Sequence, residues 1–378
     1  MNPTAFCLVP AALTHSHSRN FPLQKRTRPS MSTPPLDIPA LRRDTPGCAA
    51  TLHLNNAGSS LTPAPVHAAR LAYLDTELIL GGYEAADAEA GAIAAVYDSI
   101  ARLLGCSPGE IAACESATRA WQAVFSAVRF TPGDVIMLSE IDYGTTWASA
   151  QLAATLFGAA IELLPGTNLH GNIDSAALAA RLNDPTLPRV ALLVGTHVPT
   201  NGGVVQDVET LARCARTAGV PFILDACQTV GQLDLSVAGE YGGNAPCDAL
   251  IATSRKYLRG PRGAGFLYVR EHGPFWHAVP ATLDVWSAAM VEEPTCEDDR
   301  GAVLESPRYA PKAGARRYEV YERDYGAWVA LGAAVDYALN LGLPRIEARV
   351  KELAKRLRGA VAARLGGKLV VRDFGEGE

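Results

Sequence analysis

Short apolar runs alternate with helical patterns through most of the chain, and this alternation limits the fold more than any other feature. Val190–Thr196, for example, contains no charged residue and does not alternate between apolar and polar positions. Runs of this kind are typical of strands that are buried on both faces, and intervening helices favour parallel pairing. The sequence therefore predicts an α/β fold with a mostly parallel sheet between helices. In such folds, ligands bind at the carboxyl ends of the strands.

The expected elements cover most of the chain after residue 50. We expect strands at Leu52–Leu54, Ile111–Cys114, Val135–Ser139, Ile161–Leu164, Val190–Thr196, Pro221–Asp225, Ala249–Thr253, Gly265–Val269 and Lys368–Val371. We expect helices at Pro65–Leu80, Ala86–Leu104, Ala117–Phe130, Thr146–Phe157, Ser175–Leu182, Val208–Ala218, Tyr325–Leu341 and Leu343–Leu365. The last strand would begin a new sheet, and therefore indicates an unfinished second domain.

Composition excludes several classes of protein. Of the 378 residues, 48% are hydrophobic and 19% charged, which allows a large core and rules out a mostly disordered chain. The net charge of −5 provides no basic field and argues against a nucleic-acid binder. No uncharged apolar run reaches the roughly 18–20 residues that a transmembrane helix needs. We therefore expect no nucleic-acid or membrane partner.

The cysteines and the N-terminal segment indicate the cellular compartment of the protein. The eight cysteines form no CxxC pair and no cluster with metal-ligand spacing, which favours reduced thiols in the cytoplasm and no metal site. Residues 1–45 are basic, with no acidic residue before Asp37. We interpret them as a disordered tail, with Met31 as a candidate true start. An organellar transit peptide remains the alternative.

Three segments contain the residue types of a cofactor site. Asp225 ends an apolar strand, where it either caps the next element or pairs with a cation such as a protonated ring nitrogen. Lys256 lies between a strand and a Gly/Pro-rich loop, among other cations that favour an amine able to form an imine. Residues 115–121 lie between a strand and a helix, where small and hydroxyl side chains leave N–H groups free to bind a phosphate. Each segment alone also has an ordinary structural interpretation; their order and spacing favour the cofactor.

With these motifs the chain resembles the class V aminotransferases, which are fold-type I enzymes dependent on pyridoxal 5'-phosphate (PLP). The resemblance covers about residues 52–365. It is most specific at Leu224–Gln228, at Thr253–Gly265 and in the helix that contains Leu331–Ala334. It implies a mostly parallel seven-stranded sheet flanked by helices and a smaller α+β C-terminal domain. The motifs at Ala117–Trp121 and Arg259–Gly263 look most like the ergothioneine-lyase-like branch.

The resemblance also implies roles for single residues. Lys256 would form the Schiff base with PLP and move the Cα proton, and Asp225 would pair with the pyridine nitrogen. The residues implied to hold the phosphate are Ala117, Thr118, Thr253 and Arg255. Tyr143 would stack on the ring, and Thr200 and Gln228 would lie near the ring oxygen. Tyr143 stands where many relatives place a histidine; it can stack on the ring but cannot serve as the same acid–base group near neutral pH. We also assign Asn56 to substrate binding. His197 is either a structural residue or part of the site.

The chain departs from the family at three places. After Arg316–Glu319 the sequence is Val-Tyr-Glu-Arg-Asp, where desulfurases have a Thr-bearing turn that reaches the neighbouring subunit's phosphate. No cysteine follows Cys296, so the persulfide cysteine of desulfurases has no counterpart. The arginine that binds the substrate carboxylate in relatives would fall beyond residue 378. We therefore expect a large PLP-binding domain at 46–335 and an incomplete small domain at 336–378.

The resulting functional hypothesis is a PLP-dependent enzyme that acts on an amino acid, with C–S bond cleavage as the expected reaction. Transamination and epimerisation use the same scaffold and remain open, because a fold does not determine a reaction. A PLP-binding remnant with poor catalysis is the alternative from another class. We expect a homodimer, because relatives build each active site at a two-fold interface. We expect the protein to be in the cytoplasm.

Overall fold

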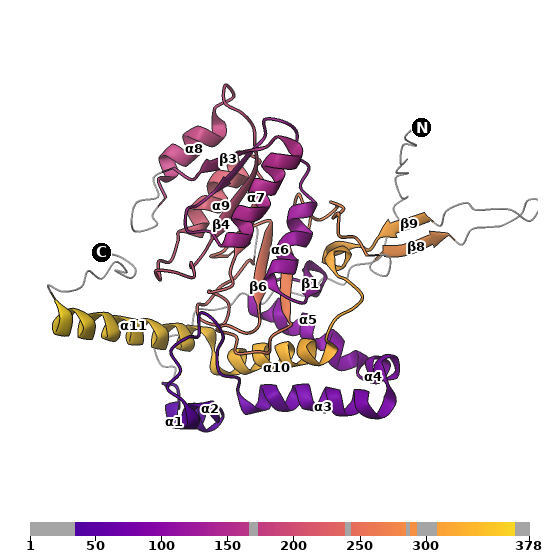
Figure 1. The fold of residues 1–378 in the computed structure, drawn as a ribbon, viewed down its shortest axis with the longest axis vertical. Helices are drawn as coiled ribbons and strands as arrows, with labels where there is room; N and C mark the ends of the chain where they lie inside the picture. Colours follow the sequence, from indigo (N-terminus) through magenta and orange to yellow (C-terminus); the bar gives the residue numbers. More distant parts are fainter. Residues whose placement is uncertain (1–34, 166–172, 239–242, 285–287, 293–307, 367–378) are drawn as a thin grey trace, which may run out of the picture. The chain divides into compact units, whose positions relative to one another are not determined.

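A computed structural model gives the fold of residues 35–165, 173–238, 243–284, 288–292 and 308–366 (Figure 1). Its helices are α1 (Ile38–Arg43), α2 (Gly47–Ala50), α3 (Ala64–Leu80), α4 (Gly82–Ala88), α5 (Ala90–Leu104), α6 (Ala117–Ser126), α7 (Gly144–Phe157), α8 (Ser175–Asn183), α9 (Val208–Thr217), α10 (Tyr325–Leu341) and α11 (Leu343–Leu365). Its strands are β1 (Ile111–Cys114), β2 (Val135–Leu138), β3 (Ala160–Leu163), β4 (Val190–Thr196), β5 (Phe222–Asp225), β6 (Ala249–Thr253), β7 (Gly265–Val269), β8 (Ala288–Glu292) and β9 (Arg308–Pro311). Two short 3₁₀ helices cover Pro108–Glu110 and Gly314–Tyr318.

Seven strands form one mixed sheet in the order β1-β7-β6-β5-β4-β2-β3. Strands β2 to β6 are parallel, whereas β7 runs antiparallel to both of its neighbours, β1 and β6. The predicted α/β fold with a mostly parallel seven-stranded sheet is therefore confirmed. Strands β8 and β9 form a separate antiparallel pair, which the sequence analysis missed.

Successive strand residues enter two different cores, one on each face of the sheet. Ile111 and Ala113 of β1 belong to the core that also contains side chains of α5, α9 and α10. Ala112 and Cys114 face the opposite core, which α6 and α7 cover. Burying a large apolar side chain contributes about 1.5–3 kcal/mol, so the two cores together fix the sheet between its helices.

The sheet topology gathers four strand ends at one edge. Thr196 of β4 is the register partner of Asp225 of β5, and Thr253 of β6 pairs with Gly265 of β7. Cys114 of β1 also pairs with Gly265, and because β1 and β6 are both antiparallel to β7 they run in the same direction. The carboxyl ends of β1, β4, β5 and β6 therefore point the same way.

Several expected elements differ from those observed. Residues 51–55 form no strand, and Leu52 and Leu54 are more than four-fifths exposed, because the sheet offers them no partner. The helix expected over 86–104 is two helices that meet at Glu89, and α6 ends at Ser126, four residues early. Ile38–Arg43, inside the expected tail, is helical and is capped by Asp37.

Other expectations are not tested. The strand at Lys368–Val371 lies outside the described residues, and so do residues 1–34 of the expected tail. The division into a large and a small domain stays a prediction.

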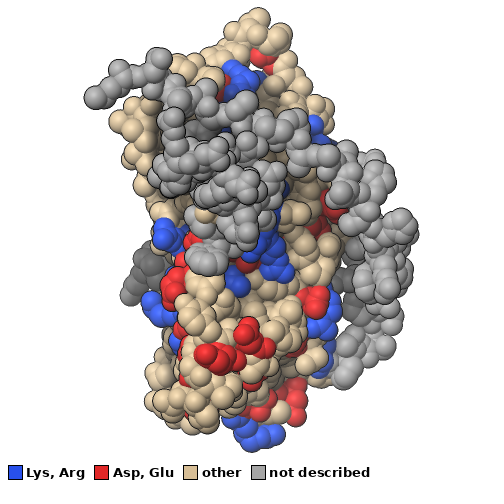
Figure 2. All heavy atoms as spheres, turned by 90° about the vertical axis from the view of Figure 1, so that its right-hand side faces the viewer, with Lys and Arg blue, Asp and Glu red and all other residues tan. Residues whose placement is uncertain are grey.

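No single helix in the described ranges is long and apolar enough to cross a membrane. Helices α10 and α11 would be apolar enough only together, and they bend by 79° at their junction. Most of α10 is buried, chiefly against α3 and α5, so its apolar composition matches that of a core helix. On the described part of the face in Figure 2, basic and acidic side chains are interspersed.

Candidate active site

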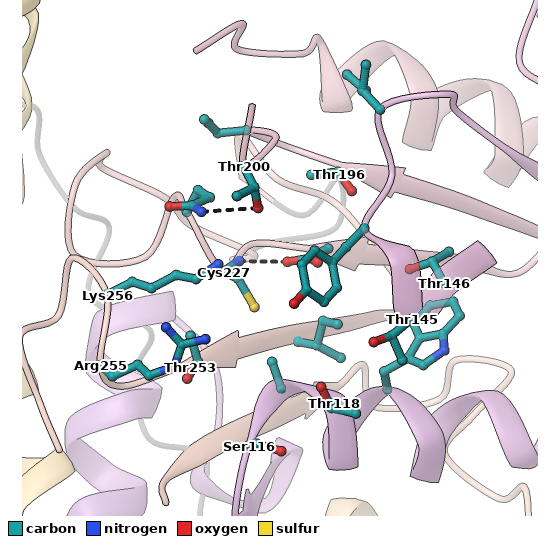
Figure 3. Close-up of a pocket in the computed structure, with 18 residues that line it drawn as sticks. Ser116, Thr118, Thr145, Thr146, Thr196, Thr200, Cys227, Thr253, Arg255 and Lys256 are labelled. Atoms are coloured by element: carbon teal, nitrogen blue, oxygen red, sulfur yellow. Dashed lines mark hydrogen bonds between the residues drawn. The ribbon is translucent and has the colours of Figure 1, made fainter. Parts of the chain in front are cut away.

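A hollow opens where the strand ends converge. Its walls come from the start of α6, the loop before α7, the ends of β4, β5 and β6, and the segments that follow these three strands (Figure 3). Nine of the predicted site residues line it: Ala117, Thr118, Tyr143, Thr200, Asp225, Gln228, Thr253, Arg255 and Lys256. Their roles toward PLP stay predictions.

Asp225 is a buried carboxylate at the end of β5, with 8% of its surface exposed. Its Oδ1 accepts a hydrogen bond of 2.8 Å from the backbone N–H of Cys227. Burial raises the pKa of Asp225 above its ordinary value, whereas the hydrogen bonds from Cys227 and the charge of Lys256 oppose that rise. Since a buried carboxylate is costly without a cation, Asp225 is suited to bind a protonated ring nitrogen.

Lys256 follows β6 and is also buried, at 7% exposed. The backbone of its loop is held by Ser254, whose N–H donates to Ala264 and whose carbonyl accepts from Gly260. The fully buried side chain of Ser254 also donates to the carbonyl of Pro261. These bonds fold the Gly/Pro-rich loop back on the strand end, so that Lys256 projects into the hollow (Figure 3).

The N-terminus of α6 forms the wall below Thr253 and Lys256 in Figure 3. Ser116 caps the helix by accepting from the N–H of Arg119 at 3.2 Å, which leaves the N–H groups of Ala117 and Thr118 available. The helix lies against β7 at Gly265, where a Cβ would come within 3.1 Å of the backbone nitrogen of Ala117. A ten-residue helix with free N–H groups at such a strand edge suits a phosphate.

Gln228 connects the hollow to the turn at residues 55–58. Its amide nitrogen donates to the carbonyl of Ala57 at 3.1 Å and to the hydroxyl of Thr200 at 3.3 Å. Its amide oxygen is buried and has no hydrogen-bond partner in the described part of the chain. Because a buried polar atom without a partner is costly, this oxygen indicates that the hollow takes a polar ligand.

Asn56 and His197 lie elsewhere. Asn56 lines a second hollow beside Arg42, His53 and Arg259. Its assignment to substrate binding stays a prediction. The side chain of His197 is buried, and the residue is not among those that line the first hollow, so its position favours the structural interpretation.

The sequence analysis assigned no role to several lining residues, among them Ser116, Trp121, Thr145, Thr196 and Cys227. Ser116, Trp121 and Cys227 lie within the motifs that it used, whereas Thr145 and Thr196 do not. A further buried acid, Asp142, lies just behind the wall. It accepts from the backbone N–H of Ser139 and from the hydroxyl of Thr196, each at 2.6 Å. Burial raises the pKa of Asp142 to about 6, and the charge of Asp225 adds to this rise. The position of Asp142 beside Tyr143 is the one signal in the sequence that could have indicated it.

The fold and the hollow together match a PLP-dependent α/β enzyme: a buried lysine, a buried carboxylate and a helix start with free N–H groups meet at one sheet edge. Residues 52–373 match the family described as aminotransferase class-V, and the chain belongs to this family. Class V aminotransferases use PLP, and the unpaired oxygen of Gln228 and the free N–H groups of α6 fit such a ligand.

Known proteins similar to this chain include epimerases and desulfurases. Isopenicillin N epimerase of Streptomyces clavuligerus is 28% identical over 283 residues, which are 74% of this chain and 67% of that protein. A probable cysteine desulfurase of Xylella fastidiosa (strain 9a5c) is 29% identical over 272 residues, 70% of this chain and 58% of that protein. The chain therefore spans about three-fifths to two-thirds of the length of these two relatives.

Solved structures share the fold. The apo structure of cysteine desulfurase from Thermococcus onnurineus NA1 has a TM-score of 0.72 at 24% identity, covering 86% of this chain and 76% of that one. The cystine C–S lyase C-DES in complex with its reaction product, cysteine persulfide, has a TM-score of 0.72 at 21% identity, covering 85% of this chain and 81% of that one. These likenesses confirm the predicted fold.

Proposed function

We propose that the chain is a PLP-dependent C–S lyase that acts on a sulfur-containing amino acid. The observation that carries the proposal is the convergence of buried Lys256, buried Asp225 and the start of α6 on one hollow. Desulfurases among the relatives and a C–S lyase among the similar structures support sulfur chemistry.

When bound, PLP withdraws electrons from the Cα of an attached amino acid. The residues of the chain would divide the remaining work. Lys256 would hold the cofactor and take the Cα proton on Nζ, while Asp225 keeps the ring nitrogen charged. The Cβ–S bond would then break with its electron pair leaving on sulfur, so the cleavage needs no external oxidant.

Among the residues that the structure describes, this hollow contains no thiol suited to the persulfide-forming route. Cys227 is the cysteine that lines it, and burial raises the pKa of its thiol well above the usual range. A protonated thiol is a poor nucleophile. We therefore propose that the sulfur leaves with the product rather than on an enzyme cysteine.

The test is product analysis on the purified protein supplied with PLP. L-Cysteine, L-cystine, an S-alkyl cysteine sulfoxide and L-alanine would each be incubated with the wild type, with Lys256→Ala, and with Lys355→Ala as a surface control. We expect pyruvate, ammonia and a sulfur product from one of the sulfur substrates, lost only in Lys256→Ala. Alanine racemised in heavy water would favour epimerisation, and a keto acid formed with pyridoxamine phosphate would favour transamination.

We also propose that the protein is a cytoplasmic homodimer. The described cysteines are free thiols, as expected in a reducing compartment. The end of α3 and the start of α4 expose Leu78, Ile79 and Tyr83, and the Tyr83 ring lies 6.5 Å from that of Tyr321. Tyr321 belongs to the segment that the family resemblance assigns to the subunit interface, so this apolar surface continues that segment.

A further inference from the structure

The second hollow shares no lining residue with the cofactor hollow, and apart from the prediction for Asn56 no role described above involves it. Residues of α1, of α2 and of the segment after α2 line it, together with Arg259 from the loop that follows β6. Two of the lining residues that the structure describes are arginines, and none is an aspartate or a glutamate. Ile38, Leu41 and Leu61 add apolar walls. A cationic and partly apolar hollow suits an organic anion.

Arg259 is held in this hollow by both its backbone and its side chain. Its φ of 65° lies in the left-handed region, which a residue with a Cβ adopts only at a cost. Its N–H donates to the carbonyl of Lys256 at 3.0 Å. Its Nε donates to the carbonyl of Leu61 at 3.2 Å, and its Nη2 donates to the hydroxyl of Thr45. Because glycine would take this conformation more cheaply, an arginine here indicates a use for the side chain.

The charge of Arg259 has no ion-pair partner among the described residues. Asp44 acts on it only by charge, and the carboxylate of Asp44 accepts from the hydroxyl of Tyr337 at 3.1 Å. Burial lowers the pKa of Arg259 below its ordinary value, although acidic groups around it act in the opposite direction. A guanidinium has five N–H donors in a planar fork that fits a carboxylate. An anion in the hollow would therefore pair with a partly buried charge that lacks a partner.

Two other lining side chains have donors to offer. The Nε2 atom of His53 is buried and has no hydrogen-bond partner in the part of the chain that the structure describes. Leaving such an atom unpaired costs about 1–3 kcal/mol, which a carboxylate oxygen would offset. Asn56 accepts from the hydroxyl of Ser60 through its Oδ1 at 3.0 Å, so its amide N–H groups remain as donors.

The turn at residues 55–58 connects the two hollows. Asn56 lines the second hollow, whereas the next two carbonyls accept from side chains that line the first. The carbonyl of Ala57 accepts from Gln228 at 3.1 Å, and the carbonyl of Gly58 accepts from Arg255. A ligand that contacts Asn56 is therefore one turn away from the cofactor hollow.

We propose that the second hollow binds a small organic carboxylate, with Arg259 as its ion-pair partner and His53 and Asn56 as further donors. The apolar walls would contact the carbon skeleton of this ligand. The carboxylate belongs either to the amino-acid substrate or to a separate small molecule, and the two sources are distinguished below. The binding itself does not depend on the proposed reaction, because it is tested without PLP.

Succinate is the probe for the site, and isothermal titration calorimetry of the PLP-free protein measures its binding. We expect saturable binding to the wild type, weakened about tenfold or more in Arg259→Gln, because a charge-assisted pair is lost. Arg262→Gln is the matched control, since Arg262 is an exposed cation of the same loop that does not line the hollow. Absence of saturable binding to the wild type, or equal weakening in the two variants, would overturn the proposal.

A second variant guards against misfolding. Arg259→Gly also removes the guanidinium but relieves the left-handed backbone, so it should stay folded by circular dichroism and still lose succinate. A folded Arg259→Gly protein that binds succinate like the wild type would refute the role of the side chain. Inorganic phosphate that displaces succinate at equal concentration would refute the preference for an organic carboxylate.

The source of the carboxylate follows from competition with S-methyl-L-cysteine, with and without PLP. Displacement of succinate only when PLP is bound would assign the hollow to the carboxylate of the substrate. Succinate that stays bound, or is displaced without PLP as well, would assign it to a separate ligand. A protein that binds succinate through Arg259 but cleaves no C–S bond would keep this site and refute only the proposed reaction.

Discussion

Lys256 and Asp225 enter the hollow from the ends of neighbouring strands, and each carries a separable part of the proposed chemistry. Lys256→Ala removes the amine that would bind PLP covalently. We expect the variant to fold and to lose the visible absorbance of bound cofactor. Borohydride reduction followed by peptide mass spectrometry should place the pyridoxyl group on Lys256 in the wild type and in Lys355→Ala. Finding it on another lysine would refute the assignment.

Asp225→Asn keeps the shape of the side chain but removes its charge. An amide cannot hold the ring nitrogen protonated by charge, so PLP should still bind while turnover falls. Breaking a buried ion pair costs about 3–5 kcal/mol, and about 1.4 kcal/mol is a factor of ten in rate, so we expect a loss of about a hundredfold or more. Steady-state kinetics at saturating PLP measure this, and near-wild-type turnover contradicts it.

Asp142 makes stability depend on pH in a predictable direction. Burial raises its pKa from 3.8 to about 6, so the folded state holds this proton more tightly than the unfolded state. The stabilisation is therefore full below about pH 4 and is lost as pH rises through about 6. Between pH 7 and pH 5 the wild type should gain about 1 kcal/mol relative to Asp142→Asn. Urea unfolding of both proteins at the two pH values tests this, and parallel pH profiles would refute it.

Some residues of the hollow could be predicted from the sequence, and others could not. Lys256, Asp225 and Gln228 could be found because their motifs are specific to one cofactor. Thr196 and Cys227 could not, since an apolar strand end and a buried thiol look like ordinary core. Asn56 follows a turn motif, but the path of residues 51–58, which a sequence does not reveal, carries it into the second hollow.

At the scale of elements, Gly265 allows α6 and the sheet to approach each other. A Cβ there would lie 2.7 Å from the carbonyl oxygen of Ala252 and about 3 Å from the backbone of Ser116 and Ala117. Gly265→Ala should therefore displace the start of α6, which we propose binds the phosphate, and cost about 1–3 kcal/mol in stability, with weaker PLP binding. Gly91→Ala on α5 is the matched control, because nothing lies within 4 Å of the position that its new methyl group would take. Thermal unfolding and PLP titration of both variants test this prediction. Equal stability and equal PLP affinity of Gly265→Ala and Gly91→Ala would contradict it.

The bounds of a strand could be predicted from the sequence where both of its faces are buried. They could not be predicted where a strand forms only if a neighbouring strand is available to pair with it. Val190–Thr196 and Ala249–Thr253 are apolar throughout, and the structure gives them the predicted bounds. Leu52–Leu54 has a similar apolar character without a strand beside it, and forms none. The antiparallel direction of β7 follows from its short connection to β6, while its place between β6 and β1 depends on pairing with a distant segment.

At the scale of the whole molecule, the homodimer prediction rests on the apolar surface of α3 and α4. Leu78, Ile79 and Tyr83 are 84%, 79% and 72% exposed. Exposed apolar side chains that lie next to one another are typical of a protein–protein interface. Each would gain about 1.5–3 kcal/mol if buried in an interface. Sedimentation velocity should therefore show a dimer at micromolar concentration.

The matched variants make the interface itself testable. Ile79→Glu would place a charge in each copy of the apolar surface, and we expect it to be a monomer with an unchanged circular dichroism spectrum. Leu357→Glu changes a side chain of α11 that is 66% exposed and lies outside this surface, so it should remain a dimer. Because about 1.4 kcal/mol is tenfold in a dissociation constant, burial lost at two equivalent Ile79 positions should weaken the dimer by at least a hundredfold. A wild-type protein that sediments as a monomer, or an Ile79→Glu variant that remains a dimer, would refute this interface.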